Sequence, residues 1–521
     1  MNILEDFLVQ RIWGCLAFCC WLMWTAPSLK AEVSIEGELQ FHSVYRDNVY
    51  DFLDKRVIDP ANPGLGEAGR DDAHFWDSQL NLDFTASLAG NISMVAGLQS
   101  NFLWGLSDDR ANDNRTNNSS PDLRTAYIEL REFIRPAFTL RVGLQSLSYD
   151  LRGNGNEFFL NTDERENRRW LTSDTVFLNT PAATNGIASA GFGFAPSNAT
   201  DDTPHIGDGN SSVAGAVKVV WDADPFFVDF FLAKLGETTG TGFRDDHDIA
   251  GIVVDYLLGE DSIVRGHLLY VHNEKFTRKN SGFNQSVGGN NVGFEGNNSF
   301  FQFGIGISYV LDWGNPFELY AEFGYQNGDF GDFRDVAGAV TKIEQDAFAF
   351  MAGLRYTFEN VAYRPWIDFS YTFISGDKDS TDGDSEAWIP YGDIDDTMIF
   401  EENHYGLGVN SGYRALKAKA GFKPSEEIEL KFIFGIFWSS EDSFLRLDPN
   451  TNTNQTLTTE DGLGQEIDLI GTWNYTEDVT FNLGVGFFAT DQFWDDVVDL
   501  GDDTISSGNA LMFDIGLDAK F

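Results

Sequence analysis

Apolar and polar residues alternate with a period of two through much of the chain. Residues 301–311, 428–438 and 466–475 place Phe, Ile, Leu, Tyr or Trp at nearly every second position. Side chains of a β-strand point alternately to opposite faces, so this period is typical of strands with one apolar and one more polar face. The pattern predicts an all-β protein.

The segments that connect these predicted strands alternate in length. Polar stretches rich in Gly, Asn and Asp, such as 45–74 and 373–405, lie between short connections. The short connections are residues 90–91, 135–137, 222–224, 259–260, 312–316, 359–360, 423–426 and 476–478. Short periplasmic turns that alternate with long extracellular loops are typical of outer-membrane barrels, which must close because hydrocarbon does not tolerate an open sheet edge. We therefore predict a single transmembrane antiparallel β-barrel of about 18 strands.

Residues 150–212 leave the number of strands open. Segments 170–180 and 186–194 could form two more strands, which would give about 20, or they could lie in one long loop. Neither segment alternates well. We therefore favour a long loop over residues 150–212.

The two ends of the chain fit an exported barrel. Arg11, the apolar run 12–24 and the small residues before Glu32 predict a cleaved secretory signal peptide over residues 1–31, which leaves the barrel to residues 32–521. The last ten positions alternate and end in Phe521, like the closing strand that outer-membrane barrels present to the barrel-assembly machinery. With an even number of strands, both termini lie on the periplasmic side of a Gram-negative outer membrane.

The composition excludes several classes of protein. The chain has 35 Lys and Arg against 81 Asp and Glu, a formal charge of −46, which argues against a nucleic acid partner because phosphate binding requires basic surface. A mean hydropathy of −0.24 excludes a bundle of apolar membrane helices. Cys15, Cys19 and Cys20 all lie in the predicted signal peptide, so the mature chain has neither disulfides nor thiol chemistry.

If the apolar strand faces contact outer-membrane lipid, the alternate positions line the lumen. The predicted pore-lining basic residues are Arg131, Arg141, Arg355, Arg364, Lys417, Lys419 and Lys431. The predicted pore-lining acidic residues are Glu36, Glu38, Glu318, Glu322, Glu466, Asp468, Asp514 and Asp518.

These charges are unevenly distributed along the chain. The basic residues from Arg355 to Lys431 come from successive strands and should form one basic patch. A second group of acidic residues should lie on strands that meet across the barrel seam, namely Glu36, Glu38, Glu466, Asp468, Asp514 and Asp518. Walls of opposite sign favour charged or dipolar solutes over apolar ones. The alternative is that the charges pair across strands and only stiffen the interior.

Several segments are similar to the alginate export family of outer-membrane β-barrel porins. Residues 141–150 and 375–406 resemble that family's strand and loop motifs, and residues 416–434 resemble its strand–Pro turn–strand unit. Residues 463–469 and 483–488 are the most similar stretch. The resemblance implies the fold and an outer-membrane channel role, and it does not identify alginate as the cargo.

We expect a channel for passive diffusion or export of hydrophilic, charged solutes such as an alginate-like acidic polysaccharide. A general porin for small ions and sugars is the alternative. An outer-membrane hydrolase or an adhesin is less favoured, because His42 and His267 have no obvious nucleophile beside them. We expect no catalytic residues, no cofactor and no metal. The aspartates of 377–384 resemble a calcium loop, but its glycine is misplaced and its bidentate Glu is missing, so a solvated loop is the simpler interpretation.

Overall fold

The computed structural model describes most of the strands and several connections. The described residues are 32–48, 73–104, 122–152, 159–161, 214–236, 247–259, 261–273, 285–287, 290–295, 298–334, 340–377, 383–392, 394–402, 406–407, 409, 411–441, 444–448, 453–458, 460–494 and 508–521. The predicted signal peptide 1–31 and the segments 170–180 and 186–194 lie outside them. Within this part of the chain, no helix is long and apolar enough to span a membrane.

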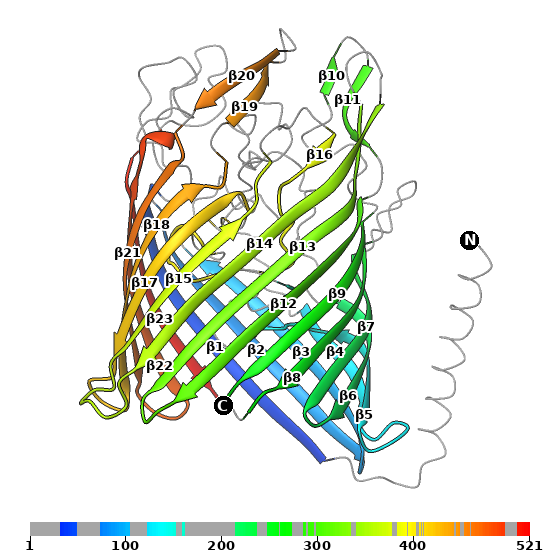
Figure 1. Ribbon diagram of the computed structural model, residues 1–521. Coiled ribbons are helices and arrows are strands. Elements are labelled where there is room, and N and C mark those ends of the chain that lie inside the picture. Colours follow the sequence, from blue (N-terminus) through cyan, green and yellow to red (C-terminus); the bar gives the residue numbers. More distant parts are fainter. Residues whose placement is uncertain are drawn as a thin grey trace, which may run out of the picture.

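Eighteen long strands form the wall of a closed antiparallel barrel, which confirms the predicted fold and strand number (Figure 1). They are β1 (Glu32–Asp47), β2 (Ala73–Ala89), β3 (Ile92–Trp104), β4 (Asp122–Leu130), β5 (Phe138–Gln145), β6 (Ala214–Ala223), β7 (Phe226–Gly236), β8 (His247–Leu257), β9 (Ile263–Asn273), β12 (Asn298–Asp312), β13 (Pro316–Arg334), β14 (Val340–Thr357), β15 (Trp366–Ile374), β17 (Tyr413–Phe422), β18 (Ile428–Ser439), β21 (Gly462–Asn474), β22 (Val479–Thr490) and β23 (Ala510–Lys520). The shorter strands are β10 (Gln285–Val287), β11 (Asn290–Glu295), β16 (Asp384–Ser385), β19 (Phe444–Asp448) and β20 (Thr453–Thr458).

The barrel closes where the last strand meets the first. β23 pairs antiparallel with β1 from Glu38 opposite Lys520 to Asp47 opposite Leu511. Beyond this ladder, the Gly37 N–H donates to the Phe521 carbonyl at 2.8 Å and the Phe521 N–H donates to the Gly37 carbonyl at 2.9 Å. The described strands of the wall therefore leave no open edge at the seam, as hydrocarbon requires.

The outer face of the barrel wall is apolar and its inner face is more polar, whereas a soluble β-sandwich has a polar outside and an apolar inside. On β12 the outward Phe301, Phe303 and Ile305 are 52%, 45% and 57% exposed, whereas the inward Gln302 is fully buried. A sandwich would bury these apolar side chains against a second sheet. An apolar outer face around a polar interior fits a strand that spans hydrocarbon.

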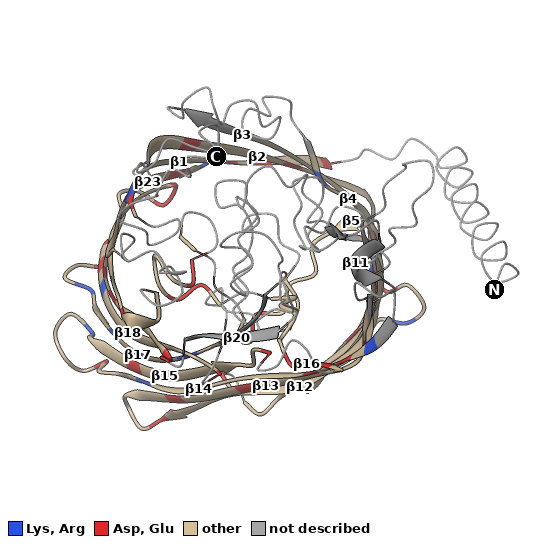
Figure 2. Cartoon of the chain, turned by 90° about the horizontal axis from the view of Figure 1, so that it is seen from above, with Lys and Arg blue, Asp and Glu red and all other residues tan. Residues whose placement is uncertain are grey.

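Two connections fold into the barrel from its long-loop end. The first inward segment follows β5 and has described residues 146–152 and 159–161, and the second inward segment joins β15 to β17 over residues 375–412. Figure 2 shows described parts of the second segment inside the ring of strands. Its Trp388, Ile399 and Phe400 are buried in an apolar cluster together with wall residues. The expectation of a solvated loop over residues 377–384 is therefore wrong for Asp377, whose side chain is buried, whereas Asp384 is exposed.

Two predicted pore-lining residues lie in turns instead of on strands. Arg131 follows the end of β4, and its exposed side chain contacts Glu129 at 2.8 Å. Arg364 lies in the turn between β14 and β15, is exposed, and approaches Glu359 at 3.6 Å. The alternation that indicates a strand does not show where the strand ends, and both residues lie just beyond one. Neither residue therefore lies on a strand of the wall.

Candidate functional site in the barrel lumen

Glutamines of the wall bind the backbone of the second inward segment. Gln326 Nε2 donates to the Ile389 carbonyl at 2.6 Å, and the Ile389 N–H donates back to Gln326 Oε1 at 2.9 Å. Gln345 Nε2 donates to the Ala387 carbonyl at 2.7 Å. A buried amide that both donates and accepts satisfies peptide groups that would otherwise lack partners. These bonds hold residues 387–389 against β13 and β14.

The first inward segment is held in the same way and contacts the second. Gln302 Nε2 donates to the Phe159 carbonyl at 2.9 Å. The Asn161 N–H donates to the Tyr391 carbonyl at 2.7 Å, and the Tyr391 ring lies 5.9 Å from that of Phe300. The two segments therefore meet inside the lumen instead of lying separately on the wall.

Aromatic packing anchors the second segment to a further part of the wall, on β17, β18 and β22. The Phe400 ring lies 4.3 Å from that of Phe437 on β18, 5.4 Å from Tyr413 on β17 and 5.6 Å from Phe488 on β22. All four side chains are fully buried. Aromatic pairs at this distance stabilise packing beyond the effect of area alone.

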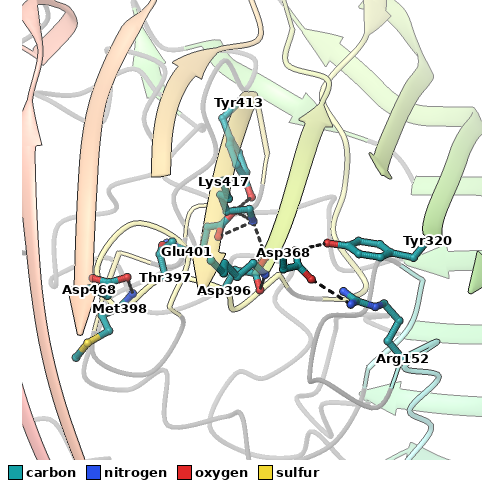
Figure 3. Close-up of polar contacts among 11 residues, drawn as sticks. Arg152, Tyr320, Asp368, Asp396, Thr397, Met398, Glu401, Tyr413, Lys417 and Asp468 are labelled. Carbon is teal, nitrogen blue, oxygen red and sulfur yellow. Dashed lines mark hydrogen bonds and ion pairs between the residues drawn. The ribbon is translucent and has the colours of Figure 1, made fainter. Parts of the chain in front are cut away.

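A network of buried charges lies beside this aromatic cluster (Figure 3). The Lys417 ammonium donates to the two Glu401 oxygens at 2.8 and 2.9 Å and contacts Asp396 Oδ2 at 2.8 Å. Lys419 binds the other Asp396 oxygen, and the Tyr413 hydroxyl donates to Glu401 Oε1 at 2.7 Å. The cations come from β17 and the anions from the second segment, so the segment neutralises the centre of the predicted basic patch.

Two wall carboxylates bind the same segment through its backbone. Glu466 accepts the Ile399 N–H at 2.6 Å and the Phe400 N–H at 3.0 Å, and Asp468 accepts the Met398 N–H at 3.2 Å. The N–H groups of a turn attract negative charge, as those at a helix N-terminus do. Both predicted acidic residues therefore face the lumen, but they are buried against the turn.

The first inward segment carries the opposite charge into the lumen. Arg152 donates to both Glu318 oxygens at 2.8 and 2.9 Å and to Asp368 Oδ2 at 3.3 Å. Its guanidinium carbon lies 3.4 Å from the Tyr320 ring centre, and the Tyr320 hydroxyl donates to Asp368 Oδ1 at 2.8 Å (Figure 3). A bidentate Arg–carboxylate pair whose guanidinium also stacks on an aromatic ring is among the stronger charge contacts in proteins.

The pKa values of Asp396 and Glu401 are shifted in opposite directions by this environment. Burial alone would raise the pKa of Asp396, but the ammonium groups of Lys417, Lys419 and Lys431 outweigh burial and hold that pKa well below its usual range. Burial raises the pKa of Glu401, which Lys417 offsets only in part. Asp396 is therefore the more firmly ionised partner of Lys417.

Part of the predicted basic patch and the acidic residues at the seam remain partly exposed to solvent. Lys431 and Arg355 are half-buried, and Arg355 lies 4.1 Å above the Trp366 ring. At the seam, Asp514 binds His42 at 3.0 Å and Asp518 accepts from Asn482 at 2.7 Å, and both remain partly exposed.

The other predicted residues lie on inner strand positions away from the charge network. Glu36 is exposed and Glu38 half-buried near the short-turn end of β1, Arg141 pairs with Glu129 at 2.6 Å, and Glu322 is buried on β13. Sequence reasoning did not identify Arg152, Asp396 or Glu401, which carry the network. For Asp396 and Glu401, the signal was the mixture of acidic and large apolar residues within residues 393–402.

The described residues contain no group of His, Cys, Asp or Glu placed to hold a metal ion. Residues 378–382 of the suggested calcium loop lie outside the described part of the chain. Asp377, at its start, is buried near the beginning of the second inward segment.

Comparison with known proteins agrees with the barrel and with the resemblance in sequence. The model of the alginate export family matches residues 245–499, which confirms the resemblance for that range. No curated protein matches the chain. Pseudomonas aeruginosa OccK9 (OpdG) is similar over 94% of this chain and 98% of its own, at 10% identity and a TM-score of 0.50. Pseudomonas aeruginosa OpdQ covers 94% and 97% of the two chains, at 11% identity and a TM-score of 0.47. At such identities the likeness concerns the fold alone, which is that of outer-membrane porins.

Proposed function

We propose that this outer-membrane barrel, which matches the alginate export family over residues 245–499, is a passive channel for hydrophilic, charged solutes. The observation that carries the proposal is a closed wall, apolar outside, whose lumen holds charged segments from the chain itself. Such an interior favours ions and dipolar solutes over apolar ones. No enzyme activity is part of the proposal.

We infer that small solutes pass along the seam side while both segments are in place. Lys417 is 0% exposed and Lys419 is 6% exposed, whereas Asp514 and Asp518 keep 17% and 24% of their side chains exposed. Glu36, near the short-turn end, is also exposed. The charges open to solvent on this wall are mainly acidic, so the channel in this conformation should prefer small cations.

An acidic polysaccharide such as alginate is the cargo that the family match favours. Such a polymer carries repeated carboxylates and would need accessible basic groups along its path. Arg355 and Lys431 are half-buried, and Lys417 and Lys419 are covered. Polymer passage therefore depends on displacement of the second inward segment, whereas passage of small solutes does not.

We also propose an arrangement in the envelope that follows from the sequence. Residues 1–31 direct export and are removed, both termini lie on the periplasmic side, and the strand that ends at Phe521 is recognised by the barrel-assembly machinery. In support, β23 ends opposite Glu38 of β1, and the C-terminus lies at the short-turn end of the barrel (Figure 1).

Recordings from purified protein in planar lipid bilayers test the channel and its charge preference. Under a potassium chloride gradient, the reversal potential should indicate cation preference, and D514N/D518N should shift it towards zero. D329N/E344Q is a matched control, because it removes the same charge from the outer face, where Asp329 and Glu344 flank Lys342. Absence of any conductance would contradict the channel, and anion preference of the unaltered protein would contradict the seam path.

A further inference from the structure

The basic wall that could receive an anionic solute already binds carboxylates of the same chain. Asp396 and Glu401 come from the second inward segment, and Lys417 and Lys419 come from β17. The Lys417 ammonium makes three contacts with carboxylate oxygens, and the Tyr413 hydroxyl donates a further hydrogen bond to Glu401. These donors form a site for two neighbouring carboxylates.

The segment that fills this site is itself unusually anionic. Residues 393–402 read Asp-Ile-Asp-Asp-Thr-Met-Ile-Phe-Glu-Glu and contain five carboxylates and no basic residue. A polyuronate presents carboxylates at regular intervals, so it resembles this segment in charge. The apolar side chains of Ile399 and Phe400 add a contact that such a polymer lacks.

We propose that residues 394–402 act as an internal ligand that competes with soluble polycarboxylates for Lys417, Lys419 and Tyr413. The inference rests on the proposed channel function and deepens it, because it assigns a binding site for one class of solute. In the conformation described, the site is occupied by the segment. A polycarboxylate that displaces the segment gains the same ammonium and hydroxyl donors.

Buried charge makes this exchange selective. If the segment leaves and nothing replaces it, the two ammonium groups lose their partners in a poorly hydrated wall, which is unfavourable. A solute that brings carboxylates restores the pairs, whereas a neutral sugar does not. The segment should therefore yield to oligouronates and remain in place with neutral oligosaccharides of equal length.

The first test removes the internal carboxylates. D396N/E401Q abolishes the two charges of the segment that contact Lys417 and Lys419, and D329N/E344Q removes equal charge from the outer face as the control. Titration calorimetry in detergent measures binding of an oligouronate and of a neutral glucose oligomer. D396N/E401Q should bind the oligouronate at least about tenfold more tightly than the control does, because the fraction of protein with a free site rises. Equal affinities of the two variants would overturn the proposal.

The second test fixes the segment in place without changing any charge. A Cβ built on Gly486 of β22 would lie 3.0 Å from the Met398 Cβ, so M398C/G486C can form a disulfide after a shift of a few tenths of an ångström, since the usual Cβ–Cβ distance is about 3.5–4.5 Å. The predicted mature chain has no other cysteine, so the bond forms only there. The oxidised protein should not bind the oligouronate, and reduction should restore binding.

The two experiments separate this inference from the proposed function. Equal oligouronate binding by the oxidised and reduced forms of M398C/G486C would overturn the inference even if D396N/E401Q failed to assemble. Because calorimetry does not depend on ion flow, it decides the competition whether or not the protein conducts. Absence of conductance in bilayers would instead contradict the channel itself.

Discussion

Replacement of Lys417 by Met tests the role of buried charge in docking the second inward segment. The Lys417 side chain is 0% exposed and contacts both Asp396 and Glu401. Met keeps an apolar stem of similar length but has no ammonium group. The variant therefore leaves two carboxylates buried beside a neutral side chain, with Lys419 as the remaining ammonium partner of Asp396.

Removal of one partner from a buried ion pair costs about 3–5 kcal/mol, because the remaining charge is left without compensation. This cost lowers the ratio of docked to undocked segment by about a hundredfold to a few thousandfold. The barrel wall should remain folded, since its long strands pair with one another and the segment adds only the short pairing of β16 with β14. The effect should therefore be local.

Hydrogen exchange measured by mass spectrometry detects this change. A peptide that covers Ile399 and Phe400, whose N–H groups donate to Glu466, should exchange faster by a factor of that order, whereas peptides from β12 and β13 should not change. K417M/D396N/E401Q removes the stranded carboxylates and should restore much of the protection. Unchanged protection in K417M, or no recovery in the triple variant, would refute this account of docking.

Three further predictions concern packing, pH and closure. Phe400→Ala should weaken docking by about 3–5 kcal/mol, which appears as faster proteolysis within residues 394–402. Docking should not weaken between pH 7 and 5. The pKa of Asp396 is lowered, so Asp396 stabilises docking until the pH falls below the ordinary value of about 4, and the pKa of Glu401 is raised, so its protonation favours the docked state as the pH falls. Loss of exchange protection at pH 5 would contradict this. Gly37→Val should slow assembly, scored by heat-dependent gel mobility, because even a Cβ there would lie 2.3 Å from the Phe521 ring; assembly at the normal rate would contradict the seam contact.

The wall of the barrel could be predicted from the sequence because bilayer chemistry acts on each strand separately. The alternation of Phe301, Phe303 and Ile305 with polar or small residues needs no knowledge of the neighbouring strands. The ends of strands are less determined, because a turn residue can continue the alternation by chance. Arg131 and Arg364 were misplaced for this reason.

The inward course of residues 375–412 could not be derived from alternation. Its buried side chains include the adjacent Ile399 and Phe400 and the adjacent Ala387 and Trp388. Such pairs break a period of two, because the segment packs against a lumen surface built from several distant strands. The composition still held a signal, since a solvated loop has no reason to carry so many large apolar residues. That signal shows burial but does not name the partners, which depend on how the whole barrel closes.

For the charged site too, strand-level sequence predicts one property of the lysines, and the contacts made by a distant loop determine another. The inner-face positions of Lys417 and Lys419 follow from the phase of β17, and the structure places both toward the lumen. Their exposure does not follow from that phase, because it depends on Asp396 and Glu401 arriving from a loop. The phase of a strand therefore predicts that these side chains point toward the lumen, but it does not predict whether a solute can reach them.

The two inward segments present charges of opposite sign to the wall, and this determines which solutes can disturb each of these contacts. The first segment brings a cation, Arg152, to wall anions, and the second brings anions to wall cations. A polyanion competes with the second segment but has no reason to displace Arg152 from Glu318, whereas a polycation has the reverse effect. Because the segments also meet at the Asn161–Tyr391 hydrogen bond, displacement of one removes a contact of the other. On the proposed function, we therefore expect the sign of a polymer's charge to decide which segment is displaced first.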